Sequence, residues 1–286
     1  MAEMQDLSKE ARDVLRWTKA PRGQIDISKF PDFLIVGPQR TGTTWLHANL
    51  TVHPEILMSY PKEILFFNRL KKVDAPTFQS DELAWYLQHF EETTARKLRK
   101  NAACLWRYRQ PYRPVFRGEA SASYAALDPD LIDEVVAINP AIKIILMLRD
   151  PIDRAWSHAI KDLVWRPGRE PDDVADAEFV SFFKKSYQLR CAAYVNNHEN
   201  WTSRLRPGHL QVCCFEDIAN CPASLLIQVF TFLGVSADRK YVSRRAGKVV
   251  GTFGKKEIPD RWRSFLLELL GDERKRAADF FDRPWR

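Results

Sequence analysis

The stretch Phe33-Leu34-Ile35-Val36-Gly37-Pro38-Gln39-Arg40-Thr41-Gly42-Thr43-Thr44 decides the fold of this chain. Its first four residues are all apolar, which is typical of a strand that is buried on both faces. The residues from Gly37 to Gly42 interrupt that pattern, and helical character resumes from Thr43 to Asn49. The stretch therefore predicts a strand, a glycine-containing loop and a helix in succession.

Two later segments repeat the order of strand and then helix. An apolar run from Ile142 to Leu148 precedes a helical pattern from about Ile152 to Leu163, and a run from Leu210 to Phe215 precedes one from Ser224 to Leu233. The tail, Asp260 to Phe281, shows two shorter helical patches. Apolar strands that alternate with helices are typical of a parallel sheet with helices on both faces. We therefore expect an α/β fold, with a parallel sheet flanked by helices.

The remaining segments are assigned around this sheet. Residues 1–30 are expected to form a helical lead-in. The segments 70–117 and 165–188 are rich in charge, proline and aromatic residues, and we interpret them as insertions near an acceptor site. No internal repeat is visible, so the sequence favours one domain over residues 1–286.

The composition excludes several classes of protein. Hydrophobic residues make up 45% of the chain and charged residues 28%, and nine Trp and 17 Phe argue against extended disorder. No apolar run reaches the roughly 18 residues that span a bilayer, and the N-terminus has no signal-peptide apolar region. The five cysteines have neither CxxC nor zinc-finger spacing. We therefore expect a cytoplasmic protein in a reducing compartment, without a membrane span.

The net charge of +7 indicates an anionic partner. Nucleic acid, a membrane surface and a phosphate-rich small molecule all fit that charge. The basic residues look spread along the chain rather than gathered in one arm, which weakens the nucleic-acid interpretation.

The loop after the first strand has the two-glycine spacing of a phosphate-binding loop. Glycines permit tight turns, and the following helix directs free N–H groups and its positive dipole end at an anion. A nucleoside-triphosphatase loop needs Lys and then Ser or Thr directly after the second glycine, but Thr43 stands in the place of that Lys. The cation Arg40 lies inside the loop instead. Kinase chemistry is therefore disfavoured, and a two-glycine spacing alone also fits an ordinary strand-to-helix turn.

Several motifs together resemble the sulfotransferase family that uses 3′-phosphoadenosine 5′-phosphosulfate (PAPS). GPQRTGTTWL is similar to the family's 5′-phosphosulfate loop, and RDPIDRAWSHA is similar to its 3′-phosphate motif. YPKEILFFN resembles the stretch that carries a catalytic Glu in the heparan-sulfate-type branch, while CAAYVNNHENW and LQVCCFEDI resemble a later helix and strand. The resemblance covers about Phe33 to Gly234.

The resemblance implies a set of donor-binding residues. The 5′-phosphosulfate would be bound by Arg40, Thr41, Gly42, Thr43 and Thr44, with Arg40 beside the bridging oxygen that gains negative charge in the reaction. The 3′-phosphate would be bound by Arg149 and Ser157.

Further donor contacts are implied less directly. Trp45 and Tyr194 match positions near the adenine, although buried aromatic rings at such positions also serve simply as core. A late basic loop in the family adds contacts to the 3′-phosphate. Arg244, Arg245, Lys248 and Lys255 are the candidates here, and Lys255 is preferred among them.

The resemblance also implies Glu63 as the general base, which takes the proton of the acceptor during in-line attack. Its apolar neighbours Ile64, Phe66 and Phe67 predict desolvation and therefore a raised pKa. By spacing alone, Glu63 also fits a solvent-facing carboxylate paired with Lys62. Two further candidates for a catalytic role are Glu119 and His158, although His158 also fits a histidine on the surface of its helix.

The function implied is transfer of a sulfuryl group from PAPS to a hydroxyl, less readily an amine, of a small metabolite or glycan. The product of the donor is adenosine 3′,5′-bisphosphate (PAP), and no metal is required. A lid at Leu105 to Arg117, which alternates aromatics with arginines, is a candidate acceptor contact, and a solvated surface loop is the alternative. The competing functions are a nucleotide or small-molecule kinase with a degenerate loop and a basic nucleic-acid-binding protein.

Overall fold

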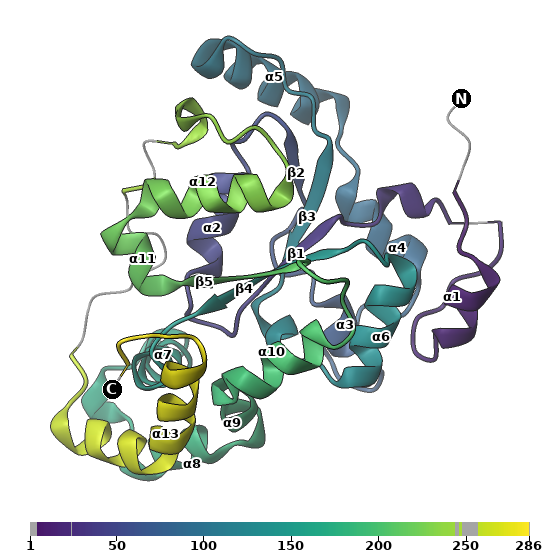
Figure 1. The fold of residues 1–286 in the computed structure, drawn as a ribbon. Coiled ribbons are helices and arrows are strands. Elements are labelled where there is room, and N and C mark those ends of the chain that lie inside the picture. Colours follow the sequence, from purple (N-terminus) through teal and green to yellow (C-terminus); the bar gives the residue numbers. More distant parts are fainter. Residues whose placement is uncertain (1–4, 24, 244–245, 248–256, 286) are drawn as a thin grey trace.

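The computed structural model describes residues 5–23, 25–243, 246–247 and 257–285. Five parallel strands form one sheet in the order β2-β3-β1-β4-β5, with helices on both faces (Figure 1). The expected α/β parallel sheet is therefore confirmed. The strands are β1 (Phe33–Val36), β2 (Ile56–Met58), β3 (Phe116–Ala120), β4 (Lys143–Leu148) and β5 (Leu210–Cys214).

The position of β1 at the centre of the sheet explains why its sequence is apolar throughout. It pairs with β3 on one side and β4 on the other, with Phe33 opposite both Gly118 and Lys143. Gly118 is required there because a Cβ at that position would lie 2.1 Å from the Phe33 ring. All four residues of β1 are buried, since helices cover both of its faces.

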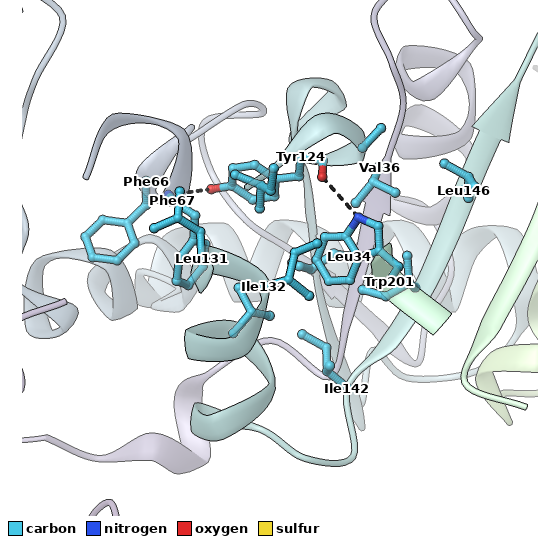
Figure 2. Close-up of a cluster of buried hydrophobic side chains, with 14 of the residues drawn as sticks. Leu34, Val36, Phe66, Phe67, Tyr124, Leu131, Ile132, Ile142, Leu146 and Trp201 are labelled. Carbon is cyan, nitrogen blue, oxygen red and sulfur yellow. Dashed lines mark hydrogen bonds between the residues drawn. The ribbon is translucent and has the colours of Figure 1, made fainter. Parts of the chain in front are cut away.

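Alternate residues of β1 belong to two separate hydrophobic clusters, one on each face of the sheet. Leu34 and Val36 pack in the first cluster, while Phe33 and Ile35 pack in the second. Figure 2 shows the first cluster, in which the Trp201 indole N–H donates to the Tyr124 carbonyl at 3.2 Å. A third cluster joins the helices α7, α8 and α13, away from the sheet.

The helices account for most of the remaining described chain. The α-helices are α1 (Lys9–Val14), α2 (Thr43–Leu50), α3 (Phe66–Arg69), α4 (Leu83–Leu87), α5 (Thr94–Tyr108), α6 (Pro129–Ile138), α7 (Pro151–Ala159), α8 (Asp176–Lys184), α9 (Ser186–Ala192), α10 (Tyr194–Thr202), α11 (Phe215–Asn220), α12 (Pro222–Leu233) and α13 (Asp260–Phe280). A π-helical turn, Ile160–Trp165, continues α7. Short 3₁₀ turns occur at Ile27–Lys29, Gln88–Phe90, Ala122–Ala126, Pro171–Asp173 and Arg239–Tyr241.

The tail differs from the sequence-based prediction. It forms the single helix α13 rather than two patches, and Gly271 lies inside it. A glycine costs a helix about 1 kcal/mol relative to alanine. Burial of Leu266, Leu270 and Ala277, which recur at helical spacing, offsets that cost.

The segment between β2 and β3 also differs from the expected lid. Its beginning, Leu105 to Tyr108, is the last turn of α5, and its end, Phe116 to Arg117, already belongs to β3. Only the residues between these two elements are loop. None of the helices described is both long and apolar enough to cross a membrane.

Candidate active site

The loop after β1 is held in shape by its own backbone and by its neighbours. The Gly37 N–H donates to the Ala122 carbonyl at 2.8 Å, and the buried Thr41 hydroxyl donates to the Pro38 carbonyl at 2.7 Å. Gly42 begins α2 with φ of 94°, and a Cβ there would lie 2.4 Å from Ile218 Cδ1. The glycine therefore permits both the turn and the close packing of α11. This geometry leaves the N-terminus of α2 directed at the space above the loop, where an anion would be stabilised.

The structure brings together Arg40, Arg149 and Ser157, although more than 100 residues separate the first from the other two. Arg40 Nε donates to Ser157 Oγ at 2.9 Å, and Arg149 Nη1 donates to the Arg40 carbonyl at 3.3 Å. Arg149 follows β4 and Ser157 lies on α7, so the carboxyl ends of the adjacent strands β1 and β4 place both beside the loop. Parallel sheets commonly bind ligands at this edge.

The surroundings of Arg149 fit a bound anion. Its guanidinium lies 4.3 Å from the centre of the Phe215 ring, and within the described ranges it forms no ion pair with a carboxylate. Burial lowers the pKa of Arg149, although the nearby Asp153 and Glu216 oppose that shift, and both burial and Arg149 lower the pKa of Arg40. Two half-buried cations side by side repel each other, so a phosphate placed between them would relieve an electrostatic cost. The residues present therefore fit the phosphate groups of PAPS.

Lys161 is a further cation of this site, and the motifs used for the sequence analysis missed it. It lies in the π-helical turn after α7 and is half-buried, and its ammonium group forms no hydrogen bond or ion pair within the described part of the chain. Burial lowers the pKa of Lys161, Arg166 and Arg40 lower it further, and the carboxylates of Asp162 and Glu63 oppose the shift. Its place four residues after Ser157, one helical turn along, is the signal that would have found it.

Glu63 lies in the turn between β2 and α3, with φ of 63°. Its N–H donates to the Ala120 carbonyl at 3.0 Å, which ties the turn to the end of β3. The expected desolvation is wrong, because its side chain is 38% exposed and paired with Lys62 at 2.8 Å. The apolar neighbours Ile64, Phe66 and Phe67 are buried in the core and do not enclose the carboxylate.

Glu119 is fully buried beneath that turn. It accepts hydrogen bonds from the hydroxyls of Tyr86 (2.6 Å) and Ser121, and Ser121 Oγ in turn accepts the Leu65 N–H at 3.2 Å. Burial raises the pKa of Glu119 to about 7, although these hydrogen bonds oppose the shift. The carboxyl group thus lies inside the protein, where it supports the turn that carries Glu63.

His158 is also buried rather than on the surface of its helix. Its Nδ1 lies 3.2 Å from Gln188 Oε1, and its Nε2 lies 3.3 Å from Asp162 Oδ2. Both ring nitrogens are therefore occupied by protein groups. Burial lowers the pKa of His158.

The two aromatic candidates for adenine contacts lie in the core. Trp45 is buried on α2, and its indole N–H donates to the Ala246 carbonyl at 3.0 Å. Tyr194 is buried at the start of α10, and its hydroxyl donates to the Arg149 carbonyl at 2.8 Å. Tyr194 therefore holds the backbone of Arg149, the candidate ligand of the 3′-phosphate. The remaining donor candidates, Arg244, Arg245, Lys248 and Lys255, lie outside the described residues.

Of the loop threonines, Thr43 is buried at the first turn of α2, and Thr44 beside it is exposed. Within the described ranges, no group of three or more His, Cys, Asp or Glu side chains is arranged to hold a metal ion.

The chain is similar in sequence and fold to known sulfotransferases. It is 28% identical over 253 residues to the mouse bifunctional heparan sulfate N-deacetylase/N-sulfotransferase 3, which covers 82% of this chain but only 25% of that protein. It is also 28% identical to the human N-deacetylase/N-sulfotransferase 2, which covers 74% of this chain and 23% of the relative. The chain thus spans about a quarter of the length of these curated relatives.

Solved structures share the fold. A sulfotransferase from Alicyclobacillus acidocaldarius superposes with a TM-score of 0.65 at 22% identity, over 90% of this chain and 98% of that one. Sulfotransferase STF9 from Mycobacterium avium gives a TM-score of 0.55 at 13% identity, over 90% and 79% of the two chains. The family model described as "Sulfotransferase domain" matches residues 30–250, which include every strand of the sheet and the whole loop. This chain therefore belongs to the PAPS-dependent sulfotransferase family.

Proposed function

We propose that this protein transfers a sulfuryl group from PAPS to a hydroxyl or amine of a glycan acceptor. The observation that carries the proposal is the meeting of Arg40, Arg149 and Ser157 beside the N-terminus of α2. The names of the curated relatives, which are heparan sulfate N-sulfotransferases, support a glycan rather than a small metabolite.

In this proposal the cations bind different parts of the donor. Arg149 and Ser157 hold the ribose phosphate of the donor. Arg40 and the N–H groups at the start of α2 hold its phosphosulfate end, where negative charge grows on the leaving oxygen. Bound PAPS supplies the sulfuryl group, and PAP is the product that remains.

Glu63 is proposed to accept the proton of the attacking hydroxyl or amine. Its partial exposure, which leaves the carboxylate accessible to an acceptor, supports this role, and so does its electrostatic interaction with Lys161, which also interacts with Arg40. The oxygen or nitrogen of the acceptor forms the new bond to sulfur, the bond to the bridging oxygen breaks, and the proton moves to Glu63.

Donor binding is tested by isothermal titration calorimetry with PAP. We expect Arg149→Ala to weaken PAP binding strongly, because it leaves the phosphate without its charged partner. Arg204→Ala, which removes a partly exposed arginine paired with Asp133 on another face, is the matched control and should leave binding unchanged. Absence of PAP binding by the unaltered protein would refute the proposal.

The acceptor and the base are tested by label transfer from radiolabelled PAPS. N-deacetylated heparosan offers an amine, heparosan offers only hydroxyls, and a simple phenol serves as the non-glycan acceptor. Glu63→Gln should lower kcat about 10²- to 10⁴-fold while PAP affinity stays unchanged. The exposed Glu91→Gln is the control. Full activity of Glu63→Gln would refute Glu63 as the base. Labelling of the phenol alone would refute a glycan acceptor.

A further inference from the structure

The segment from residue 94 to residue 117 is strongly basic. It contains eight Lys and Arg and no Asp or Glu, whereas the whole chain has a net charge of +7. The rest of the chain therefore sums to −1, although basic residues also occur along its whole length. Most of this segment is α5, at the edge of the molecule beyond β2 and β3 and far from α7 and α13 (Figure 1).

Helix α5 has two apolar faces, and only one of them is used in the core. Cys104 and Tyr108, one turn apart, are buried in the second hydrophobic cluster, where the Tyr108 ring lies 5.2 Å from that of Tyr241. On another side of the helix, apolar side chains recur at helical spacing and are exposed. This exposed stripe consists of Ala95, Leu98, Ala102, Leu105 and Trp106, with 64% of Leu98, 44% of Leu105 and 76% of Trp106 accessible.

Cations flank the exposed stripe. Lys97 and Arg99 adjoin Leu98 in the sequence, so their side chains leave the helix on the two sides of the stripe. Arg107, next to Trp106, is exposed as well.

A depression of about 510 Å³ lies beside the same helix. Three cations line it, together with Leu57, Glu92, Tyr112 and Pro114; the cations are Lys97, Arg113 and Arg117. The carboxylate of Glu92 is already paired with Lys100 at 2.8 Å and accepts the Tyr112 hydroxyl at 2.9 Å. The three lining cations therefore face a space suited to a singly or doubly charged anionic group.

We propose that α5 docks this protein on an anionic membrane surface. In this arrangement the exposed stripe enters the boundary between headgroups and acyl chains, the flanking cations contact anionic lipids, and the depression accepts a headgroup phosphate. Helices with Leu and Trp on one face and Lys and Arg around it bind membranes in this way. A polyanionic glycan or a nucleic acid would match the charge but offers no apolar partner for Leu98 and Leu105.

The test is co-sedimentation of the full chain with vesicles of phosphatidylcholine alone or mixed with phosphatidylglycerol. We expect binding to the anionic vesicles only, weakened by added salt. Arg99→Gln with Arg107→Gln should weaken binding about fivefold for each cation removed. Leu98→Ser, Leu105→Ser and Trp106→Ser together should weaken it by more than about tenfold.

The matched control is the double variant Arg261→Gln with Leu267→Ser, which makes the same kinds of substitution at exposed residues of α13. It should bind vesicles as the unaltered protein does. All variants should keep their thermal unfolding midpoint and their PAP affinity, since the altered side chains are exposed and lie outside the donor site. PAP binding is thus scored separately, and failure of one proposal leaves the other intact.

Three results would overturn the membrane proposal. One is equal binding to neutral and anionic vesicles, and another is vesicle binding that the α5 variants do not change. The third is that the protein binds a heparin oligosaccharide but not anionic vesicles. In that case the heparin binding would be lost in the Arg99→Gln, Arg107→Gln variant and kept in the variant that lacks the apolar stripe. That last result would assign the surface to an anionic glycan.

Discussion

At the scale of single residues, the surroundings of the Lys161 side chain favour a bound anion. Its ammonium group is half-buried, has no partner within the described chain, and lies within electrostatic reach of both Arg40 and Glu63. A partner with negative charge would offset the desolvation that lowers its pKa. Such a charge is available when the sulfuryl group of the donor is bound.

We expect Lys161→Ala to lower kcat about 100-fold, the usual effect of removing one group that stabilises developing negative charge. PAP affinity should change far less, because PAP lacks the sulfuryl group. The measurements are steady-state kinetics with PAPS and titration with PAP, and the exposed Lys184→Ala is the control. Equal losses of PAP affinity and kcat would instead place Lys161 at a phosphate shared by donor and product.

The buried Glu119 predicts how stability depends on pH. Burial raises its pKa from 4.5 to about 7, so the folded state favours the protonated carboxyl. Its contribution is therefore fully present below pH 4.5 and is lost as the pH rises to about 7 and beyond. We expect the free energy of unfolding of the unaltered protein to fall by about 3 kcal/mol relative to Glu119→Gln across that interval.

Urea unfolding of both proteins at pH 5 and pH 8 measures this difference. Parallel changes in the two proteins would show that Glu119 does not titrate with a raised pKa. Glu119→Gln should keep the turn of Glu63 in place, since a side-chain oxygen remains to accept the Ser121 hydroxyl.

At the scale of elements, the start of α7 joins the donor site to the tail helix. Asp150 caps α7 through Oδ1, which accepts the N–H groups of Ile152 (2.8 Å) and Asp153 (3.4 Å). Its Oδ2 pairs with Arg274 of α13 at 2.9 Å. The residue just before this cap is Arg149, so the cap helps to fix the 3′-phosphate candidate.

Asp150→Ala is expected to lower stability by about 1–2 kcal/mol through loss of the cap. It should also weaken PAP binding, because the backbone that carries Arg149 is freed. Asp150→Asn keeps an oxygen for the cap and loses only the ionic part of the contact with Arg274, so it should be the milder change in both assays. Thermal unfolding and PAP titration compare the two, and the opposite ranking would contradict a capping role.

At the scale of the whole molecule, donor-site binding should stabilise the fold in a localised pattern. A ligand that binds only the folded state adds about 2.7 kcal/mol at a concentration of 100 times its Kd. With PAP we expect amide hydrogen exchange to slow at residues 37–46 and at the start of α7. Exchange in α5 should not change, because α5 lies outside the donor site.

Hydrogen-exchange mass spectrometry with and without PAP measures this pattern. Slower exchange in α5 would show that the nucleotide reaches the basic segment and would contradict the location proposed for the donor. Arg149→Ala at the same PAP concentration is the control, and its exchange should resemble that of the protein without PAP.

Much of the fold was predictable because helices cover both faces of the sheet, which makes several strands mostly apolar. β1 is apolar throughout, β4 and β5 are apolar apart from Lys143 and Gln211, and the predicted and observed bounds of these three strands agree to within one residue. β2 has only three residues, and β3 includes Arg117 and Glu119, so neither produces a distinct apolar run. Their positions depend on pairing with neighbours far along the chain.

The sequence by itself determined the loop, its helix and the family. The residues that make an anion-binding turn are contiguous, and the glycines among them permit the backbone conformation of the turn. Only the tertiary structure decided that Glu63 is exposed beside Lys62, that Glu119 is buried, and that Lys161 lies within reach of Arg40. Burial and electrostatic environment are produced when segments that are separate in the sequence pack together. No local pattern of residue types contains that information.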